Sequence, residues 1–575
     1  MKENYIMKVR NPRSIQRIES PTGLFAPRPE TLDGKRIAII PEKFDSDIFF
    51  EMLEKLISDK YPTATISRVQ IGFMDKPEKL VEKVAGNYDV WLEGVKTSGA
   101  WEMDRLAALE KAGVPGVTIS IDELAPQRRR LAAMNGMPAL RIATLSAERF
   151  FTTERSCEKI MDIAKDAFDD ILHALTDPIT EAEKNPVLPE YDYSDLCFEG
   201  CCYSEANDKL QSYFAEHDLT DGLAIVPPTE EAVMHMLSGT SLDSKKEIGI
   251  LAPGRGVATV EKVAINAVMA GAKPEYLPVI IAAVEALVDP AFDEHHIQVC
   301  VASTSTLIAV NGPIAKELGM NGKTAYLSPG NRANSTIGRA VSLCLINIGW
   351  AIERFEGKWT GTANRYCNIT FCENEEDSPW NSYAAEYGFA PEECTVTVDE
   401  IMTIERGPAG TMFTAPLEED LKSLSKMVRA FVHSDGDNSP KRVLNQGITT
   451  LLIFPAQARQ FAAAGYSKEA LKNELCNRHR KTWDDFDSDV QAQYLELAKE
   501  GHIPLLSIDD CKSGGTVPTV NRNRLRIYVV GSMAGTTLGM YGIGNYNNIN
   551  RGFDYKLPPF NTKKIRGATL TKAGK

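Results

Sequence analysis

The sequence lacks the features that would place the chain in a membrane or on nucleic acid. No stretch approaches about 20 uninterrupted apolar residues, so we expect no transmembrane helix. The first residues, MKENYIMKVRNPRSIQRIES, carry charges but no apolar core, so we expect no secretory signal. Basic residues are outnumbered, 64 to 78, and the net charge of −14 argues against nucleic acid or an anionic membrane as a partner.

Cysteine frameworks and short catalytic motifs are also missing. The 11 cysteines are scattered and odd in number, which fits a reducing cytoplasm better than a disulfide scaffold. Cys201 and Cys202 form a vicinal pair with no second pair nearby, for which structural thiols are the default interpretation. There is no HExxH, paired CxxC, GxSxG, Walker loop or EF-hand sequence. No metal site is therefore predicted, and any cofactor stays unknown.

Two polar stretches contain metal-ligand residue types without the spacing that a metal needs. His295 and His296 are adjacent and would point in different directions from a helix or a strand, so a solvated loop is the favoured interpretation. The acidic run from Glu373 to Asp377 is typical of a solvated face, although one carboxylate could pair with an arginine or act as a general base. A metal-dependent hydrolase or lyase using these residues stays the weakest alternative.

A regular alternation of strands and helices predicts an α/β fold with a doubly wound parallel sheet. At 575 residues the chain is too long for a single core. A buried strand is predicted from RIAII and further strands from TATISRVQI, YDVWLEGV and VPGVTIS, each followed by a helical pattern. A proline-rich acidic stretch precedes a second alternation, with predicted strands in EIGILAPGRG, IQVCVASTSTLIAV, TTLLIF, IPLLSI and RLRIYVVGS.

This pattern predicts four parts of the chain. Residues 1–33 form a polar arm, 34–179 a flavodoxin-like α/β domain, 180–200 a linker and 201–575 a large mixed α/β domain. Whether the large domain has two lobes is left open. The charge and the polar arm are compatible with a homo-oligomer, which we expect.

The segment LSPGNRANSTIGRA is the strongest candidate for binding an anion. Asn331 and Asn334 stand at the start of a predicted helix, and Arg332 and Arg339 are seven residues apart, on about the same helix face. Free backbone N–H groups, the helix dipole and two guanidinium groups would hold a small acidic molecule. The alternative is a well-capped helix whose arginines pair with carboxylates elsewhere in the fold.

Two further turns follow predicted strands. In APGRGVAT, Gly254, Arg255 and Gly256 have the position of a phosphate-cradling loop, but the third glycine of a dinucleotide motif is missing. A tight turn that needs glycine is an equal alternative, and Arg255 favours an anion. Asn311 ends an apolar strand and could point into a crevice at the sheet edge, although a plain turn is favoured.

Long ordered blocks of the sequence resemble one protein family. They are DGLAIVPPTEEAV, ILAPGRGVATVEKVAINAVMAGAKPEYLPVIIAAVEAL, NGPIAKELG, SPGNRANSTIGRA, ENEEDSPW and EYGFAPEECTVTV. These blocks cover most of residues 200 to 400 and look like the large domain of the UGSC family. The N-terminal domain resembles that family's thiol or selenol domain, which is similar to the selenoprotein B subunits of glycine and betaine reductases.

The family is named for a Sec/Cys-Gly-Ser-Cys sequence after a strand, and this chain departs from it there. The corresponding residues are Val95, Lys96, Thr97 and Ser98, and Cys157 is the only cysteine of the predicted N-terminal domain. Because the thiolate is the nucleophile in such chemistry, a redox cycle through this pair cannot run here. Lys96 could instead bind an anion or serve as a base or Schiff-base former.

Together these observations predict a cytoplasmic enzyme that acts on a small carboxylate-bearing metabolite in a cleft between the two domains. Lys96 and Ser98 would face the reacting carbon, while the arginine helix and the glycine loop hold the negative charge. Without the thiols, a lyase, hydratase or hydrolase type step is favoured over reduction. The alternative is a scaffold or regulatory subunit of a reductase-like complex, because the resemblance implies relatives that work as multi-subunit complexes.

Overall fold

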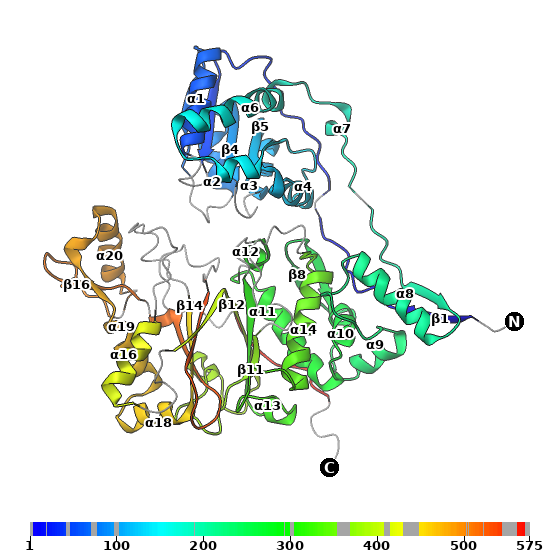
Figure 1. The fold of residues 1–575 in the computed structure, drawn as a ribbon, viewed down its shortest axis with the longest axis vertical. Coiled ribbons are helices and arrows are strands. Elements are labelled where there is room, and N and C mark those ends of the chain that lie inside the picture. The colour runs from blue at the N-terminus through cyan, green and yellow to red at the C-terminus, as the bar shows by residue number, and fades with distance from the viewer. Residues whose placement is uncertain are drawn as a thin grey trace.

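The computed structural model shows an N-terminal α/β domain and a larger α/β region, with two segments of chain crossing between them (Figure 1). The structure describes residues 4–18, 20–41, 47–70, 77–96, 103–188, 190–292, 294–299, 304–352, 369–407, 415–428, 448–501, 503, 505–520, 522–542 and 561–569. None of the helices in these ranges has both the length and the apolar character needed to cross a lipid bilayer.

Five parallel strands form the sheet of the N-terminal domain. They are β2 (Arg36–Pro41), β3 (Thr65–Arg68), β4 (Val90–Lys96), β5 (Gly116–Ile121) and β6 (Ile142–Leu145). Their order in the sheet is β3-β2-β4-β5-β6, and every neighbouring pair is parallel. This is the flavodoxin-like strand order, and the predicted doubly wound α/β sheet is confirmed.

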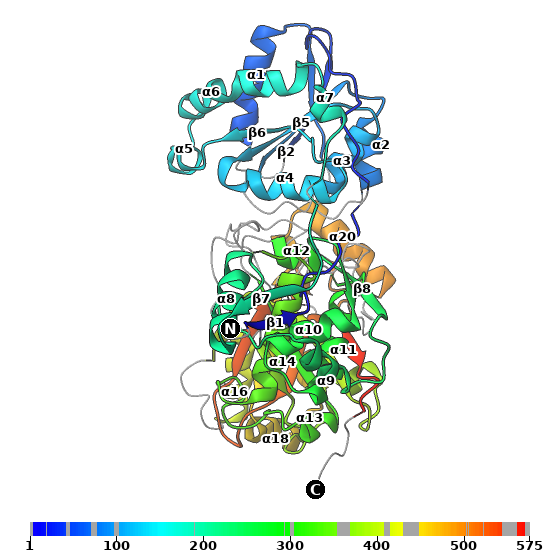
Figure 2. The same ribbon diagram turned by 90° about the vertical axis from the view of Figure 1, so that its right-hand side faces the viewer.

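Helices cover both faces of this sheet, so its central strands are buried on both sides. α1 (Asp47–Lys60), α5 (Ala147–Thr152) and α6 (Cys157–Thr176) pack on one face. α2 (Pro77–Val84), α3 (Met103–Lys111) and α4 (Ala125–Met134) pack on the other, as Figure 2 shows. A short 3₁₀ turn, η2 (Asp122–Leu124), precedes α4, and the short α7 (Glu181–Lys184) follows α6.

The N-terminal arm joins the two parts of the molecule. Its first strand, β1 (Tyr5–Val9), pairs antiparallel with β7 (Leu196–Gly200) beside the large region. Further along the arm, Leu24 is buried among α2 and α3, and Arg28 makes a buried ion pair with Glu110 of α3. The arm therefore packs on both parts of the same chain.

One part of the large region surrounds a mixed four-stranded sheet with the order β11-β10-β12-β19, whose last strand comes from the C-terminal part of the sequence. Its strands are β10 (Ser305–Asn311), β11 (Ile369–Cys372), β12 (Thr395–Ile401) and β19 (Thr562–Lys564), and a hairpin of β8 (Glu247–Leu251) and β9 (Gly256–Thr259) lies beside it. The helical elements are α8 (Tyr203–Glu216), α9 (Glu230–Leu237), α10 (Val260–Met269), η3 (Pro274–Tyr276), α11 (Leu277–Leu287), α12 (Glu294–Val299), α13 (Ile314–Glu317), α14 (Arg332–Asn347) and η4 (Ala384–Tyr387). α10, α11 and α14 form the centre of one large apolar core with these strands.

A second part of the large region contains another four-stranded sheet, with the order β13-β18-β14-β17. Its strands are β13 (Thr403–Arg406), β14 (Ile448–Ile453), β17 (Leu525–Val529) and β18 (Leu538–Gly542), and β14 and β17 are parallel. Around it lie α16 (Leu417–Met427), α18 (Pro455–Ala463), α19 (Lys468–Asn477) and η6 (Arg522–Arg524). A small separate core joins α20 (Ser488–Glu500) and η5 (Trp483–Asp485) to the two-stranded sheet of β15 (Arg480–Thr482) and β16 (Thr516–Pro518).

Two of the predicted strands are wrong. The stretch IQVCVASTSTLIAV begins inside helix α12, and only its second half is a strand, β10. The described residues of IPLLSI, which include Ile503 and Leu506, form turns that pack on α20. Short apolar runs look alike in a buried helix, a strand and a buried turn, so periodicity alone could not separate them.

Candidate active site

In α14, the helix that was predicted to bind an anion, the capping residue and one arginine make contacts with the protein itself. Asn331 is the N-cap, and its side chain accepts a hydrogen bond from the Asn334 backbone N–H at 3.0 Å. Arg339 makes a bidentate ion pair with Asp221, with N–O distances of 2.7 and 2.9 Å, and both side chains are largely buried. These contacts fit the alternative of a well-capped helix whose arginines pair elsewhere in the fold.

The other polar residues at the start of α14 also have partners in the protein. Arg332 donates from Nε and Nη2 to the Gly271 carbonyl at 3.1 and 2.9 Å, although its side chain is exposed. The buried amide of Asn334 bonds the backbone of Asn321 and the carbonyl of Tyr326. Asn334 thus fastens the preceding loop to the helix, while a ligand role for Arg332 stays a prediction.

The predicted glycine loop is the turn of a β-hairpin between β8 and β9, so it does not lead directly from a strand into a helix. A Cβ on Gly256 would lie 1.7 Å from the Ile348 carbonyl oxygen, and one on Gly254 would lie 2.3 Å from Cβ of Trp350. Arg255 has a positive φ of 57°, and its carbonyl accepts from the Arg17 N–H. The two glycines are therefore explained by close packing against the chain that follows α14.

Asn311 is buried at the end of β10, where it bonds two carboxylates of the acidic run. Its amide nitrogen donates to Glu373 at 2.7 Å and to Glu375 at 2.8 Å. Glu373 is itself buried and forms an ion pair with Lys468 at 3.4 Å. The expected solvated face is thus wrong for Glu373, while Glu376 is exposed and pairs with Lys323.

The end of β4 is the position at which an α/β sheet of this order binds ligands. Such sites lie beyond the carboxyl ends of the strands, where the strand order reverses, which here is between β2 and β4. Lys96 is the last residue of β4 and pairs with Ser120 of β5. Gly94 has a φ of +135°, and a Cβ there would lie 2.3 Å from the Ile119 carbonyl oxygen, so glycine is needed for β4 to end in this way. Ser98 and the side chain of Lys96 lie outside the described part of the structure, which gives only the backbone position of Lys96.

Three buried polar side chains meet near the same end of the sheet. The Thr118 hydroxyl donates to Glu93 Oε2 at 2.6 Å, and Arg128 of α4 donates to the same oxygen at 3.1 Å and also contacts that hydroxyl. Burying two charges costs desolvation that their attraction barely offsets, so we interpret the pair as positioning α4 at this edge. The sequence analysis missed this set, although an acidic residue inside the apolar strand YDVWLEGV is a signal for it.

α4 also contacts the large region. The Arg130 guanidinium donates to the Trp350 carbonyl, and Val299 at the end of α12 belongs to the same buried cluster as Leu131. Arg13 of the arm stacks over the Trp350 ring at 4.2 Å. Figures 1 and 2 both place α12 beneath the N-terminal domain, on the side of α4. We call this contact, formed by Arg13, Arg130, Val299 and Trp350, the seam.

Two cations lie close together at the seam. Burial lowers the pKa of Arg13 to about 10, against the attraction of Asp218, and the nearby charge of Arg130 lowers it further. Arg13 donates to the carbonyls of His217 and Asp218 at 2.7 and 3.2 Å. An anion bound here would offset the repulsion between the two guanidinium groups.

The predicted anion helix lies largely away from this seam. The 16 residues of α14 rise about 24 Å, with Arg332 at one end and Trp350 just beyond the other. Because Trp350 is the residue that α4 touches, Arg332 is at the far end of the helix from the N-terminal domain. A single small molecule held by both Lys96 and Arg332 is therefore not supported.

The histidines that were weighed as metal ligands lie on α12, next to the seam. Glu294 is buried and accepts from the Ala252 N–H at 2.7 Å, so it supports the glycine loop. His295 is half-buried, and the side chain of His296 lies outside the description. Within the described ranges, no three His, Cys, Asp or Glu side chains form a group that could hold a metal ion.

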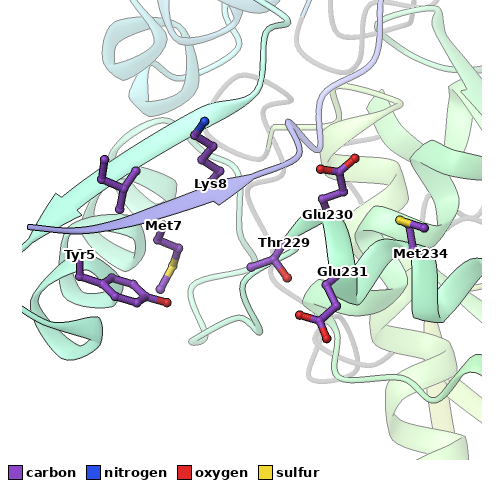
Figure 3. Close-up of a pocket in the computed structure, with 8 residues that line it drawn as sticks. Tyr5, Met7, Lys8, Thr229, Glu230, Glu231 and Met234 are labelled. Carbon is purple, nitrogen blue, oxygen red and sulfur yellow. The ribbon is translucent and has the colours of Figure 1, made fainter.

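Two hollows of the large region contain none of the predicted site residues. An open groove of about 550 Å³ runs between β1 and the start of α9, with Tyr5 and Met7 on one side and Glu231 and Met234 on the other (Figure 3). A smaller cavity of about 150 Å³ lies at the ends of β14 and β17, lined among others by Tyr326.

Comparison with known proteins finds one family that is similar to the part of the chain that contains β4. Residues 8–177 match the model of the UGSC family. This segment is therefore similar to the UGSC family, over less than half of the chain. The match ends at residue 177, so the likeness of residues 200 to 400 to the family's large domain stays a prediction, as does the likeness to selenoprotein B. No curated protein and no solved structure gives a significant match to the chain.

Proposed function

We propose that the chain is an enzyme that acts on a small carboxylate-bearing metabolite where the UGSC segment meets the large region. The observation that carries the proposal is the position of Lys96 at the end of β4, next to the reversal of the strand order. In the resemblance to the UGSC family, Lys96 directly follows Val95, which occupies the position of the family's first thiol or selenol. The step we propose is therefore of lyase, hydratase or hydrolase type, with Lys96 as base or Schiff-base former.

In this proposal the carboxylate of the substrate binds at the seam. Arg13 and Arg130 supply two guanidinium groups within each other's field, and α4, which carries Arg130, is held at the β4 edge by the Arg128–Glu93 pair. Guanidinium groups bind carboxylates by charge-assisted hydrogen bonds. This assignment replaces the cleft that was expected between Lys96 and the α14 arginines.

A scaffold or regulatory subunit is the second candidate function. The observation that favours it is the missing thiol pair in the UGSC segment, where the sequence has Val95 to Ser98. An enzyme should bind and convert its substrate alone, whereas a scaffold should co-purify with a partner that carries the thiols. We propose a cytoplasmic location and a homo-oligomer for either function, and sedimentation of the purified chain tests the oligomer.

A panel of small mono- and dicarboxylates tests the enzyme proposal, with thermal shift as the screen and calorimetry as the measurement of affinity. Arg130→Gln keeps an N–H donor for the Trp350 carbonyl but removes the charge, so we expect binding weaker by about 1.5–3 kcal/mol. Arg332→Ala, at the far end of α14, tests the anion site that the sequence predicted there, and we expect unchanged affinity if the seam holds the carboxylate.

Lys96→Ala separates binding from chemistry. We expect this variant to keep most of the carboxylate affinity and to lose turnover of the substrate that the panel identifies. Loss of binding in Arg332→Ala with no effect of Arg130→Gln would return the anion site to α14. No carboxylate binding, together with a stoichiometric thiol-bearing partner in a pull-down, would favour the scaffold.

A further inference from the structure

Two exposed thiols lie in contact where β7 ends and α8 begins. The Cys201 and Cys202 sulfur atoms are 3.8 Å apart, and both side chains are exposed. Cys202 is the N-cap of α8, so the helix begins directly after it. The default of structural thiols is not supported for this pair, because buried, inert packing is what characterises structural cysteines.

The groups around the two sulfur atoms shift the pKa values of the two thiols in opposite directions. Backbone N–H groups of Glu205 and Ser204 bond the Cys202 sulfur and lower the pKa of its thiol, and the Cys201 thiol donates to it as well. The single proton of the Cys201 thiol is shared between the Cys202 sulfur and the Glu205 carboxylate, and the hydrogen bond to Glu205 raises the pKa of Cys201 to about 11. Cys202 is therefore the sulfur that ionises first.

The position of Glu205 is fixed independently of the thiols. Its carboxylate accepts from the Cys201 backbone N–H at 2.8 Å and pairs with Lys209, one helical turn further along α8, at 2.8 Å. The turn that carries the two cysteines is thus tied to the first turns of the helix. Both sulfur atoms stay at the surface with one of them next to the helix N-terminus, which favours a thiolate.

We propose that Cys201 and Cys202 form a surface dithiol that exchanges with low-molecular-weight disulfides, with Cys202 as the attacking sulfur. The Cys202 thiolate attacks one sulfur of the small disulfide, forms a mixed disulfide and expels one small thiolate. Cys201 then releases its proton to solvent, attacks the Cys202 sulfur and expels the second small thiolate. Two electrons pass from the protein thiols to the small disulfide, which leaves as two thiols.

The product of this exchange would reopen easily. Adjacent residues have Cα atoms about 3.8 Å apart across a trans peptide, below the range of about 4.4–6.8 Å usual for disulfides. A cross-link forced into this spacing stores strain and is readily reduced. The pair therefore suits reversible exchange rather than permanent cross-linking of the fold.

The test uses the full native chain and a limiting amount of dithiodipyridine, a neutral disulfide whose released thiopyridone is measured by absorbance. We expect two thiopyridones per reacted chain, and peptide mapping by mass spectrometry should find Cys201 and Cys202 modified before any other cysteine. Cys157 and Cys197 are internal controls, because both are exposed and neither lies next to another cysteine in the chain.

Serine variants divide the two steps. In Cys202→Ser we expect the initial rate to fall at least about tenfold, because the sulfur whose pKa is lowered is gone. In Cys201→Ser we expect a rapid first release that stops at one thiopyridone, with the mixed disulfide retained on Cys202. Cys157→Ser should behave as wild type. Modification of Cys157 or Cys197 before Cys202, or an undiminished initial rate in Cys202→Ser, would overturn the proposal.

Discussion

Arg339 and Asp221 are joined by two parallel hydrogen bonds of 2.7 and 2.9 Å, between residues 118 positions apart in the chain. Their side chains are only 14% and 6% exposed, so the pair fastens α14 to the loop before α9 at a site that water scarcely reaches. Arg339 therefore stabilises the fold, and we expect its removal to lower the free energy of unfolding rather than the affinity for a ligand.

We expect Arg339→Ala to lower the free energy of unfolding by about 3–5 kcal/mol, because it leaves the Asp221 carboxylate buried without its partner. Urea unfolding followed by circular dichroism measures the change. Arg339→Ala with Asp221→Ala should recover part of the loss in a double-mutant cycle. A variant as stable as wild type that had lost carboxylate binding would contradict this assignment and support a ligand role for Arg339.

A second buried pair predicts a pH-dependent effect. Arg28 and Glu110 are 1% and 0% exposed, and burial raises the pKa of Glu110 above its usual 4.5, although Arg28 opposes the shift. A carboxyl group with a raised pKa favours the folded state below pH 4.5, and this contribution is lost as the pH rises through the folded pKa.

Arg28→Met removes the partner, so we expect a loss of about 3–5 kcal/mol at neutral pH that grows from pH 4.5 upward. Urea unfolding at a series of pH values measures it. Adding Glu110→Gln to Arg28→Met should remove most of the pH dependence, because no buried carboxylate remains. A deficit that does not change with pH would show that the pair acts only through packing.

The short helix α7 gives the opposite pH dependence. Burial alone would raise the pKa of Glu183, but hydrogen bonds from Arg141 and from the Thr180 cap outweigh it and lower the pKa to about 2. The contribution of this carboxylate to stability is complete above its usual pKa of 4.5 and is lost as the pH falls through about 2.

For Glu183→Gln we expect a loss of about 1–2 kcal/mol at neutral pH, discounted because the carboxylate is partly solvated. The difference from wild type should shrink between pH 4.5 and about 2, as thermal unfolding at several pH values would show. Glu181→Gln in the same helix is the control, since its side chain is 80% exposed and should matter little. An equal effect of the two substitutions would refute the role of the cap.

Gly256→Ala tests whether the glycine loop is a packing feature. The new Cβ would lie 1.7 Å from the Ile348 carbonyl oxygen, so backbone must move, and we expect a loss of at least about 1–3 kcal/mol. Gly535→Ala is the matched control, because its Cβ would meet only Cβ and Cγ of Phe454, at ordinary distances of 3.6 and 3.9 Å. Urea midpoints of the two variants decide the question, and equal midpoints would contradict the packing interpretation.

Part of the candidate site followed from local sequence features. Asn331, which was predicted to stand at the start of a helix, is the N-cap of α14, because capping depends on the next three residues of the same chain. The position of Lys96 after YDVWLEGV also followed, since the end of a buried strand can be read from its apolar run. The helical position of His295 on α12 and the turns formed by IPLLSI could not be predicted in this way, because they depend on neighbours remote in sequence.

The alternation of strands and helices, the parallel N-terminal sheet and the residues at its carboxyl edge can be predicted from the amino-acid order, because each depends on periodicity within a short window. Which charges meet is settled by the folding of distant segments onto one another. Arg339 takes Asp221, Arg128 takes Glu93, and Arg130 comes near Arg13 across the seam. Whether a guanidinium group can bind a substrate depends on how deeply it is buried and on whether a carboxylate from a remote part of the chain pairs with it. Both are set only when the chain folds.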